Sequence, residues 1–226
     1  MRTTPCVVLA ACATLAPAAT TLIEETRVFN LFAQGSSDLG GDQNTALAYG
    51  ADSNDDPFVP WFVADAVSAT GAQSAIGSAS GQFAMDIDPD RFAFSGSLTA
   101  SATIFDETGQ QAEGSGSAMM QVRFDLAQTT QWRLLIDASD NAGVTLVSGV
   151  NGPQIFSAGP GTTDQLHILG PGAYTLTFSA SVAAILFGQG AASAQTTIDA
   201  SFAVVPAPGA ALLLALALPA ARRRRS

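Results

Sequence analysis

Residues 174–182 read Tyr-Thr-Leu-Thr-Phe-Ser-Ala-Ser-Val, and this stretch is the clearest indication of the fold class. Apolar side chains alternate with threonine or serine at every second position. A period of two is expected when one face of a β-strand is buried and the other is solvated. The stretch therefore predicts a strand that points Tyr174, Leu176 and Phe178 into a core, followed on the same face by Ala180 and Val182.

The same alternation recurs earlier in the chain. Polar residues such as Arg123, Asp125, Arg133 and Asp137 are expected to point away from the core. The predicted inward positions are Phe92, Phe94, Leu98, Ala100, Ala102, Ile104, Met120, Val122, Phe124, Leu126, Trp132, Leu134 and Ile136. Turn-forming residues separate these runs at 88–90, 140–143, 151–153 and 170–172.

Short strands with turns between them predict an all-β fold, an antiparallel β-sandwich or jelly-roll-like domain, over residues 19–204. About 185 residues suffice for one domain with a sizeable core, and no linker divides them. Residues 35–56 are rich in Gly, Ser, Asp and Asn and are expected to form a long loop. The stretch 62–69 is compatible with a helix or a strand.

The charge distribution limits the partners of this body. All nineteen acidic residues lie between Glu24 and Asp199, where only four arginines are basic, so the body carries a formal charge of −15. The whole chain contains no lysine. Such a surface repels nucleic acid and anionic lipid headgroups, which excludes a nucleic-acid function, and it favours solubility.

The N-terminus predicts export. Met1 and Arg2 form a short positive region, residues 7–15 are apolar, and residues 16–18 read Ala-Pro-Ala, which together predict a signal peptide over residues 1–18. The Sec translocon and signal peptidase are the implied partners. An alternative is a lipoprotein signal with Cys12 as the acylated residue. Because Cys6 and Cys12 are the only cysteines, the mature body would hold no disulfide, thiol nucleophile or cysteine-based zinc site.

The C-terminus combines a proline motif, an apolar run and a basic end. No charged side chain occurs from Phe202 to Ala221, and a helix beginning near Pro208 would span only about 20 Å, short of a bilayer core of about 30 Å. The four arginines that follow would stay in the cytoplasm. The plain interpretation is a weak tail anchor or a hydrophobic helix with a basic cap.

This order of parts resembles the PEP-CTERM sorting signal, in the variant group that replaces its central glutamate, here with Ala207. The residues that carry the resemblance are Val205, Pro206, Ala207, Pro208, Arg222, Arg223, Arg224 and Arg225. It implies an exosortase, a membrane-embedded cysteine protease, as partner. It also implies transient inner-membrane anchoring by residues 205–226, then release or attachment at the surface of an exopolysaccharide-producing Gram-negative cell. The Pro171-Gly172-Ala173-Tyr174 step is similar to the step before the penultimate strand of many such ectodomains.

Catalytic machinery is difficult to find. His167 is the only histidine, expected at the surface or near a turn with Leu166 and Ile168 on the opposite face of its strand, and a serine triad has no other base. The sequence also lacks a Gly-x-Ser-x-Gly elbow and a phosphate-binding glycine loop.

Paired carboxylates leave one enzymatic alternative, a secreted carbohydrate-active enzyme. Glycoside hydrolysis needs two carboxylates facing one cleft. The candidates are Glu107 and Glu113 beside a predicted loop and Asp125 and Asp137 on outward strand positions, with Trp61 or Trp132 lining the cleft.

Calcium binding is a further hypothesis, because Asp86, Asp88 and Asp90 would project to one side of an extended segment and offer the oxygen ligands that Ca²⁺ prefers. A second acidic cluster contains Asp52, Asn54, Asp55 and Asp56. The competing interpretation is a solvated turn in which Asp caps backbone amides.

The sequence therefore favours a noncatalytic exported cell-surface or extracellular-matrix protein, associated with exopolysaccharide or biofilm and without a required cofactor. The alternatives are a carbohydrate-active enzyme, a calcium-dependent carbohydrate-binding module on a β-sandwich, and a ligand-binding module with its site on residues 35–56.

Overall fold

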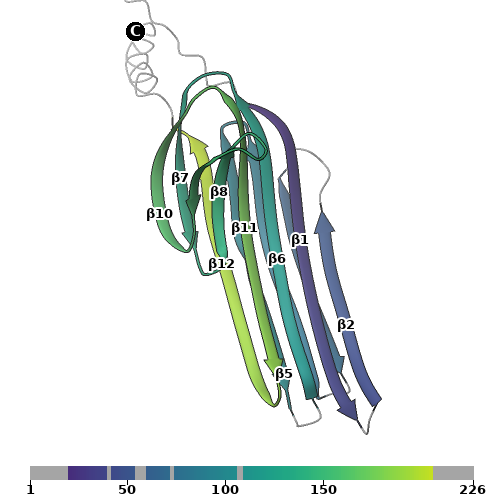
Figure 1. Ribbon diagram of the computed structural model, residues 1–226. Coiled ribbons are helices and arrows are strands. Elements are labelled where there is room, and N and C mark those ends of the chain that lie inside the picture. Colours follow the sequence, from purple (N-terminus) through teal and green to yellow (C-terminus); the bar gives the residue numbers. More distant parts are fainter. Residues whose placement is uncertain (1–19, 40–41, 54–59, 72–73, 106–108, 206–226) are drawn as a thin grey trace, which may run out of the picture.

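The computed structural model describes residues 20–39, 42–53, 60–71, 74–105 and 109–205. The expected signal peptide, the Glu107 carboxylate and all of the tail beyond Val205 lie outside these residues. Within them the chain forms strands joined by short connections, in two antiparallel sheets packed as a sandwich (Figure 1). The predicted sandwich is thus confirmed.

Each sheet has six strands. In spatial order, the first sheet contains β2 (Asp42–Ser53), β1 (Thr20–Leu39), β6 (Gly109–Leu126), β11 (Gly172–Phe187), β8 (Ala142–Ser148) and β9 (Gln154–Ala158). The second sheet contains β10 (Gly161–Leu169), β7 (Thr130–Ala138), β12 (Gly190–Val204), β5 (Arg91–Ile104), β4 (Ala75–Asp88) and β3 (Trp61–Gly71). Every pairing within the two sheets is antiparallel.

The predicted inward positions are confirmed. The side chains of Tyr174, Leu176 and Phe178 are buried in β11, and every inward position predicted in β5, β6 and β7 is buried as well. Arg133, Asp125 and Asp137 are exposed on the opposite faces. The predicted turns also fall between strands, and Asn141 adopts the left-handed conformation (φ 62°) that asparagine tolerates in a turn.

The core is aromatic near the end where the chain leaves the sandwich. The Trp132 ring stacks on Phe202 and Phe92, with ring centroids 4.8 and 5.5 Å apart, and Phe124 packs beside it. Tyr174 stacks on Phe124 and donates a hydrogen bond from its hydroxyl to the Gly170 carbonyl at 2.8 Å. This bond ties the Gly-Pro-Gly turn to the start of β11.

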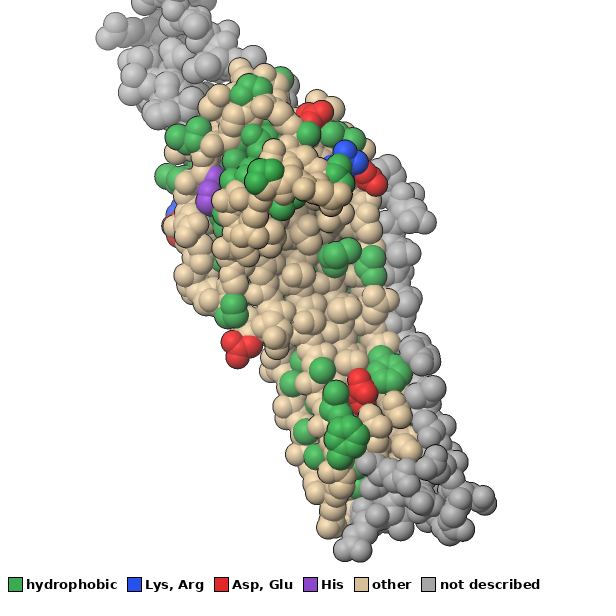
Figure 2. Space-filling view, viewed as in Figure 1, with side chains coloured by type: hydrophobic (Ala, Val, Ile, Leu, Met, Phe, Trp, Pro, Cys, Tyr) green, Lys and Arg blue, Asp and Glu red, His purple; other side chains and the backbone are tan. Residues whose placement is uncertain are grey.

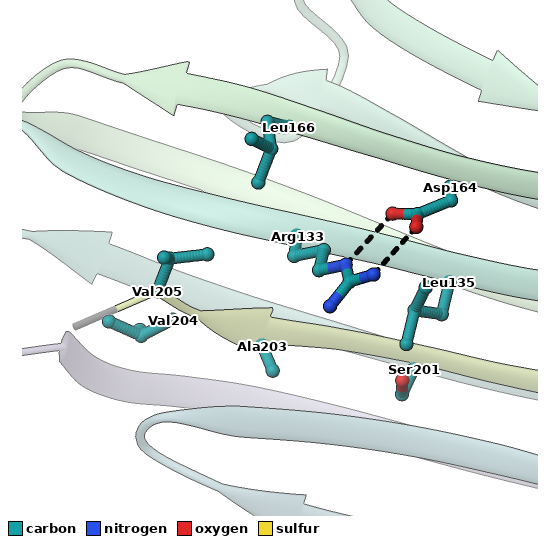
Figure 3. Close-up of a pocket in the computed structure, with 8 residues that line it drawn as sticks. All are labelled: Arg133, Leu135, Asp164, Leu166, Ser201, Ala203, Val204 and Val205. Carbon is teal, nitrogen blue, oxygen red and sulfur yellow. Dashed lines mark hydrogen bonds and ion pairs between the residues drawn. The ribbon is translucent and has the colours of Figure 1, made fainter.

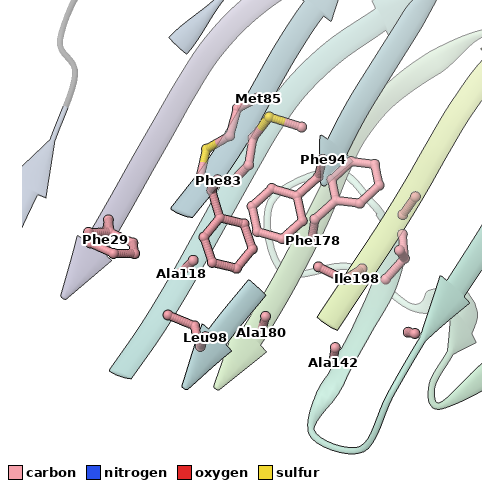
Figure 4. Packing of buried hydrophobic residues seen from close by; sticks show 14 of the residues in the cluster. Phe29, Phe83, Met85, Phe94, Leu98, Ala118, Ala142, Phe178, Ala180 and Ile198 are labelled. Carbon is pink, nitrogen blue, oxygen red and sulfur yellow. The ribbon is translucent and has the colours of Figure 1, made fainter. Parts of the chain in front are cut away.

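The middle of the core is also filled from both sheets. Phe83 and Phe94 of the second sheet lie 4.9 Å apart between ring centroids, Phe83 contacts Phe29, and Phe94 stacks on Phe178 (Figure 4). Because these rings come from β1, β4, β5 and β11, they join strands that are far apart in the sequence. Aromatic pairs of this kind add stability beyond the area that they bury.

At the opposite end the two sheets approach until their backbones meet. A Cβ atom placed on Gly77 of β4 would lie 1.9 Å from the Glu113 carbonyl oxygen of β6, and one on Gly114 would lie 1.9 Å from the Ser78 carbonyl oxygen. Packed sheets are usually about 10 Å apart, a spacing that side chains fill. Here only glycine fits, and the sandwich narrows toward this end (Figure 2).

The structure corrects the interpretation of residues 35–56. They are not a long loop, because β1 continues to Leu39 and pairs with β2 over Asp42–Ser53 in a hairpin. Of the glycines in this stretch, Gly35 is required by packing, because a Cβ atom there would lie 2.3 Å from the Ala75 carbonyl oxygen. The stretch 62–69 is a strand, part of β3.

Candidate functional site

The start of the predicted sorting motif is held at the aromatic end of the sandwich. The Val205 amide donates a hydrogen bond to the Gln131 carbonyl at 2.8 Å, and the Val204 amide donates one to the Asp90 carbonyl at 2.9 Å. These bonds fix the last described residue beside β7 and the turn between β4 and β5. The rest of the motif, residues 206–208 and 222–225, lies outside the described part of the chain.

A shallow depression lies at this exit point, on the outer face of the second sheet. It is lined by Arg133, Leu135, Asp164, Leu166, Ser201, Ala203, Val204 and Val205 (Figure 3). The strand register explains the composition: Leu166 of β10 pairs with Arg133 of β7, which pairs in turn with Ala203 of β12. Side chains from three adjacent strands therefore reach one surface.

An ion pair crosses the depression. The Arg133 guanidinium donates two hydrogen bonds to the Asp164 carboxylate, from Nε to Oδ1 at 2.8 Å and from Nη2 to Oδ2 at 2.6 Å. The hydrogen bond lowers the pKa of Asp164 and raises the pKa of Arg133, so both groups are charged at neutral pH. Exposed pairs of this kind contribute little to stability. The main effect of this ion pair is on the local charge, because the guanidinium and carboxylate charges cancel.

The chemistry of the depression is that of a contact surface. Leu166 and Leu135 are exposed to 58% and 39% of their full area beside the ion pair. Ser201 supplies the one side-chain hydroxyl of the lining, and the one carboxylate there, Asp164, is already bound by Arg133. Apolar side chains beside a neutralised ion pair suit contact with another protein surface.

The predicted calcium ligands do not come together. Asp86 and Asp88 lie on alternate positions of β4, and Asp90 lies in the turn that follows. Among the residues that the structure describes, no three His, Cys, Asp or Glu side chains form a group that could hold a metal ion. Of the second acidic cluster, Asp52 is in β2 and the other three residues lie outside the described ranges. The calcium site stays a prediction.

Of the carboxylates considered for hydrolysis, the structure describes Glu113, Asp125 and Asp137, and Asp125 does not share a cleft with Asp137. Asp125 is exposed on β6 of the first sheet, whereas Asp137 is exposed on β7 of the second sheet. Glu113 lies within β6 and not beside a loop. Trp132 is fully buried in the core, so it cannot line a surface cleft.

His167 is partly exposed at the margin of the sandwich, near the turn that follows β10, but its side chain points inward. Its ring faces the space between the sheets and stacks on Phe156 at 4.2 Å between centroids, and burial lowers the pKa of the imidazole. Leu166 and Ile168 do lie on the opposite face, but that face is the exposed one. Since Phe156 belongs to the edge strand of the facing sheet, the histidine closes the side of the sandwich.

One buried ion pair was not predicted from the sequence. Arg27 and Glu25 of β1 lie on the inner face of the sandwich, with 2.5 Å between Arg27 Nη2 and Glu25 Oε1, and both side chains are almost fully buried. Glu25, Arg27 and Phe29 are spaced by two, so in a strand their side chains point to the same face. This spacing was the signal in the sequence that could have placed the two charges beside the core. Removing one partner of such a pair leaves a buried charge, so the pair is expected to be important for the integrity of β1.

The chain matches no protein-family model, no curated protein and no solved structure. Over the described ranges, no helix has the length and apolar character needed to cross a membrane.

Proposed function

We propose that this chain is a noncatalytic exported protein of the cell surface or extracellular matrix, sorted through a PEP-CTERM-like tail by an exosortase-type protease and associated with exopolysaccharide or biofilm. The observation that carries the proposal is the order of parts in residues 205–226, where a Val-Pro-Ala-Pro motif precedes an apolar run and four arginines.

The position of the motif supports this assignment. The last strand ends at Val204, and the motif begins at the next residue. All of β12 thus lies before the motif, and the Val205 amide adds a backbone hydrogen bond to the Gln131 carbonyl. A protease could remove the tail without taking a strand from the fold.

The body supports a role outside the cell. Its core is built from stacked aromatic rings and contains no cysteine, so it needs no disulfide to hold the two sheets together. Its acidic charge disfavours aggregation and binding to nucleic acid. The outer face of the second sheet presents side-chain hydroxyls, including the pairs Ser78–Ser101 and Ser80–Thr99, each 2.7 Å apart between oxygens. Such groups can exchange hydrogen bonds with a neutral polysaccharide.

The test compares cells with and without the exosortase. The protein is isolated from membrane, surface and medium fractions, and its C-terminal mass is measured. We expect surface or released protein to lack Arg222–Arg225 in the presence of the protease, and the intact chain to accumulate in the membrane in its absence.

Two variants refine this experiment. The double variant Pro206→Ala/Pro208→Ala should block processing, whereas Pro153→Ala, in the turn between β8 and β9, should be processed normally. Surface protein that keeps Arg222–Arg225 would overturn the sorting proposal.

A further inference from the structure

Strand β10 ends the second sheet with a regular, unbroken edge. It pairs with β7 over nine consecutive residues, Gly161–Leu169, without a register shift, and it has no neighbour on its other side among the described strands. A strand at the end of a sheet carries unpaired backbone N–H and C=O groups, which can pair with another strand.

Of the other three edge strands in the described part of the sandwich, β9 and β3 are protected in the usual ways, and β2 contacts β3 of the facing sheet. Strand β9 has five residues, follows Pro153 and contains a register shift against β8. Strand β3 carries the exposed carboxylate of Asp65. Short length, proline, irregular register and charge all hinder edge-to-edge pairing. Strand β10 has none of these protections.

The charge on β10 is cancelled. Asp164 is its only acidic residue and is bound by Arg133 of the neighbouring strand. The exposed face instead presents Leu166 and Ile168, the latter exposed to 73% of its area, beside Leu135 of β7. Figure 2 shows hydrophobic side chains around His167, the single histidine, at the same margin.

We propose that β10 pairs with β10 of a second copy of this chain, in an antiparallel two-fold arrangement centred on Leu166, so that the two second sheets become one continuous sheet. A second copy can meet this edge without charge repulsion, because the bond between Arg133 and Asp164 leaves the β10 edge of both copies locally neutral. Two bodies of formal charge −15 repel each other over most of their surface, whereas the β10 edge is locally neutral and apolar.

The register centred on Leu166 follows from the same residues. It places Leu166 opposite its symmetry mate and Ile168 opposite Asp164 of the partner, so no two like charges face each other directly. The two Leu166 side chains then cover each other on the outer face, and Ile168 lies against the paired Asp164 of the partner, while Gln165 and His167 pair on the inner face. A two-fold axis makes this interface closed, which limits the assembly to a dimer.

The first test measures molar mass in solution by light scattering, from ~1 μM to ~1 mM protein. We expect a concentration-dependent dimer. Leu166→Lys should weaken it at least ~10-fold, because on the two-fold axis the two lysines would face each other as like charges. Phe187→Lys is the matched control, since Phe187 is exposed to 74% of its area on β11 of the other sheet, and it should leave the dimer unchanged.

The second test reports the register by disulfide formation in a Cys6→Ser/Cys12→Ser background. Leu166→Cys should form an intermolecular disulfide on mild oxidation, because a residue on the two-fold axis faces its own copy. Ile168→Cys should not, because it faces residue 164. A monomer throughout the concentration range, or a dimer that Leu166→Lys does not weaken, would overturn the proposal. These measurements use purified protein and do not depend on processing of the tail.

Discussion

The glycine contacts between the two sheets allow a quantitative prediction. Gly114→Ala places a Cβ atom 1.9 Å from the Ser78 carbonyl oxygen and 2.8 Å from the Ser101 carbonyl oxygen. Real Cβ atoms essentially never approach other heavy atoms closer than 3.0 Å, so β6 must move from β4 by at least 1.1 Å, the difference between 3.0 and 1.9 Å. Backbone atoms cannot rotate away as a side chain can.

The size of the effect follows from this movement. Overpacking a core costs about 1–3 kcal/mol, and we expect the upper end, about 3 kcal/mol, because both obstacles are strand backbones. For a domain of this size each kcal/mol shifts the melting temperature by about 2–4 °C, so Gly114→Ala should lower it by roughly 6–12 °C.

The assay is thermal unfolding followed by far-ultraviolet circular dichroism. Gly159→Ala is the matched control, because a Cβ atom at Gly159 meets no heavy atom within 4 Å. It should leave the melting temperature nearly unchanged. If Gly114→Ala melts within about 2 °C of the unmodified protein, the sheets separate freely at this end and the steric reasoning is wrong.

Three further predictions concern the other end of the sandwich. Trp132→Ala should lower the free energy of unfolding by about 3–5 kcal/mol in a urea titration. Trp132→Phe should lower it clearly less, because it keeps a ring between Phe92 and Phe202. It also removes an indole N–H that has no hydrogen-bond partner in the described structure. Burial lowers the pKa of His167 in the folded state below its unfolded value of about 6.5. The contribution of His167 to stability should therefore be full above that pH and decline as the pH falls below it. His167→Phe should remove this pH-dependent part of the stability when urea midpoints are compared near pH 7.5 and pH 5.5. A stop codon at Pro206 should give protein with an unchanged circular dichroism spectrum and no membrane-bound fraction, because β12 ends at Val204; a loss of β structure would place essential residues in the tail.

The sequence predicted best where core side chains are large. In β11 and β6, Phe178 and Phe124 stand among alternating polar residues, so the period of two is visible without a structure. The hairpin of β1 and β2 was missed because its far end packs through glycine. Phe29, Leu31 and Ala33 mark the inner face of β1 before this end, but Gly35 packs against a neighbouring backbone and has no side chain to continue the pattern.

Two other features required the structure. On β10 the apolar residues Leu166 and Ile168 face outward and His167 faces inward, which inverts the usual pattern because Phe156 covers the histidine. The depression beside Val205 combines residues of β7, β10 and β12, and this combination depends on strand order. Pairings between strands that are distant in the chain leave no local signal in the sequence.

The place of β12 has a consequence for the timing of folding. Although it is the last strand to be synthesised, it occupies the interior of its sheet, with β7 on one side and β5 on the other. Under the proposed export the chain emerges from its N-terminus, so this sheet would remain split into two parts until Val204 had crossed the membrane. Only Val205 separates the strand from the first proline of the tail. On this proposal, completion of the fold and arrival of the tail at the membrane would be nearly the same event.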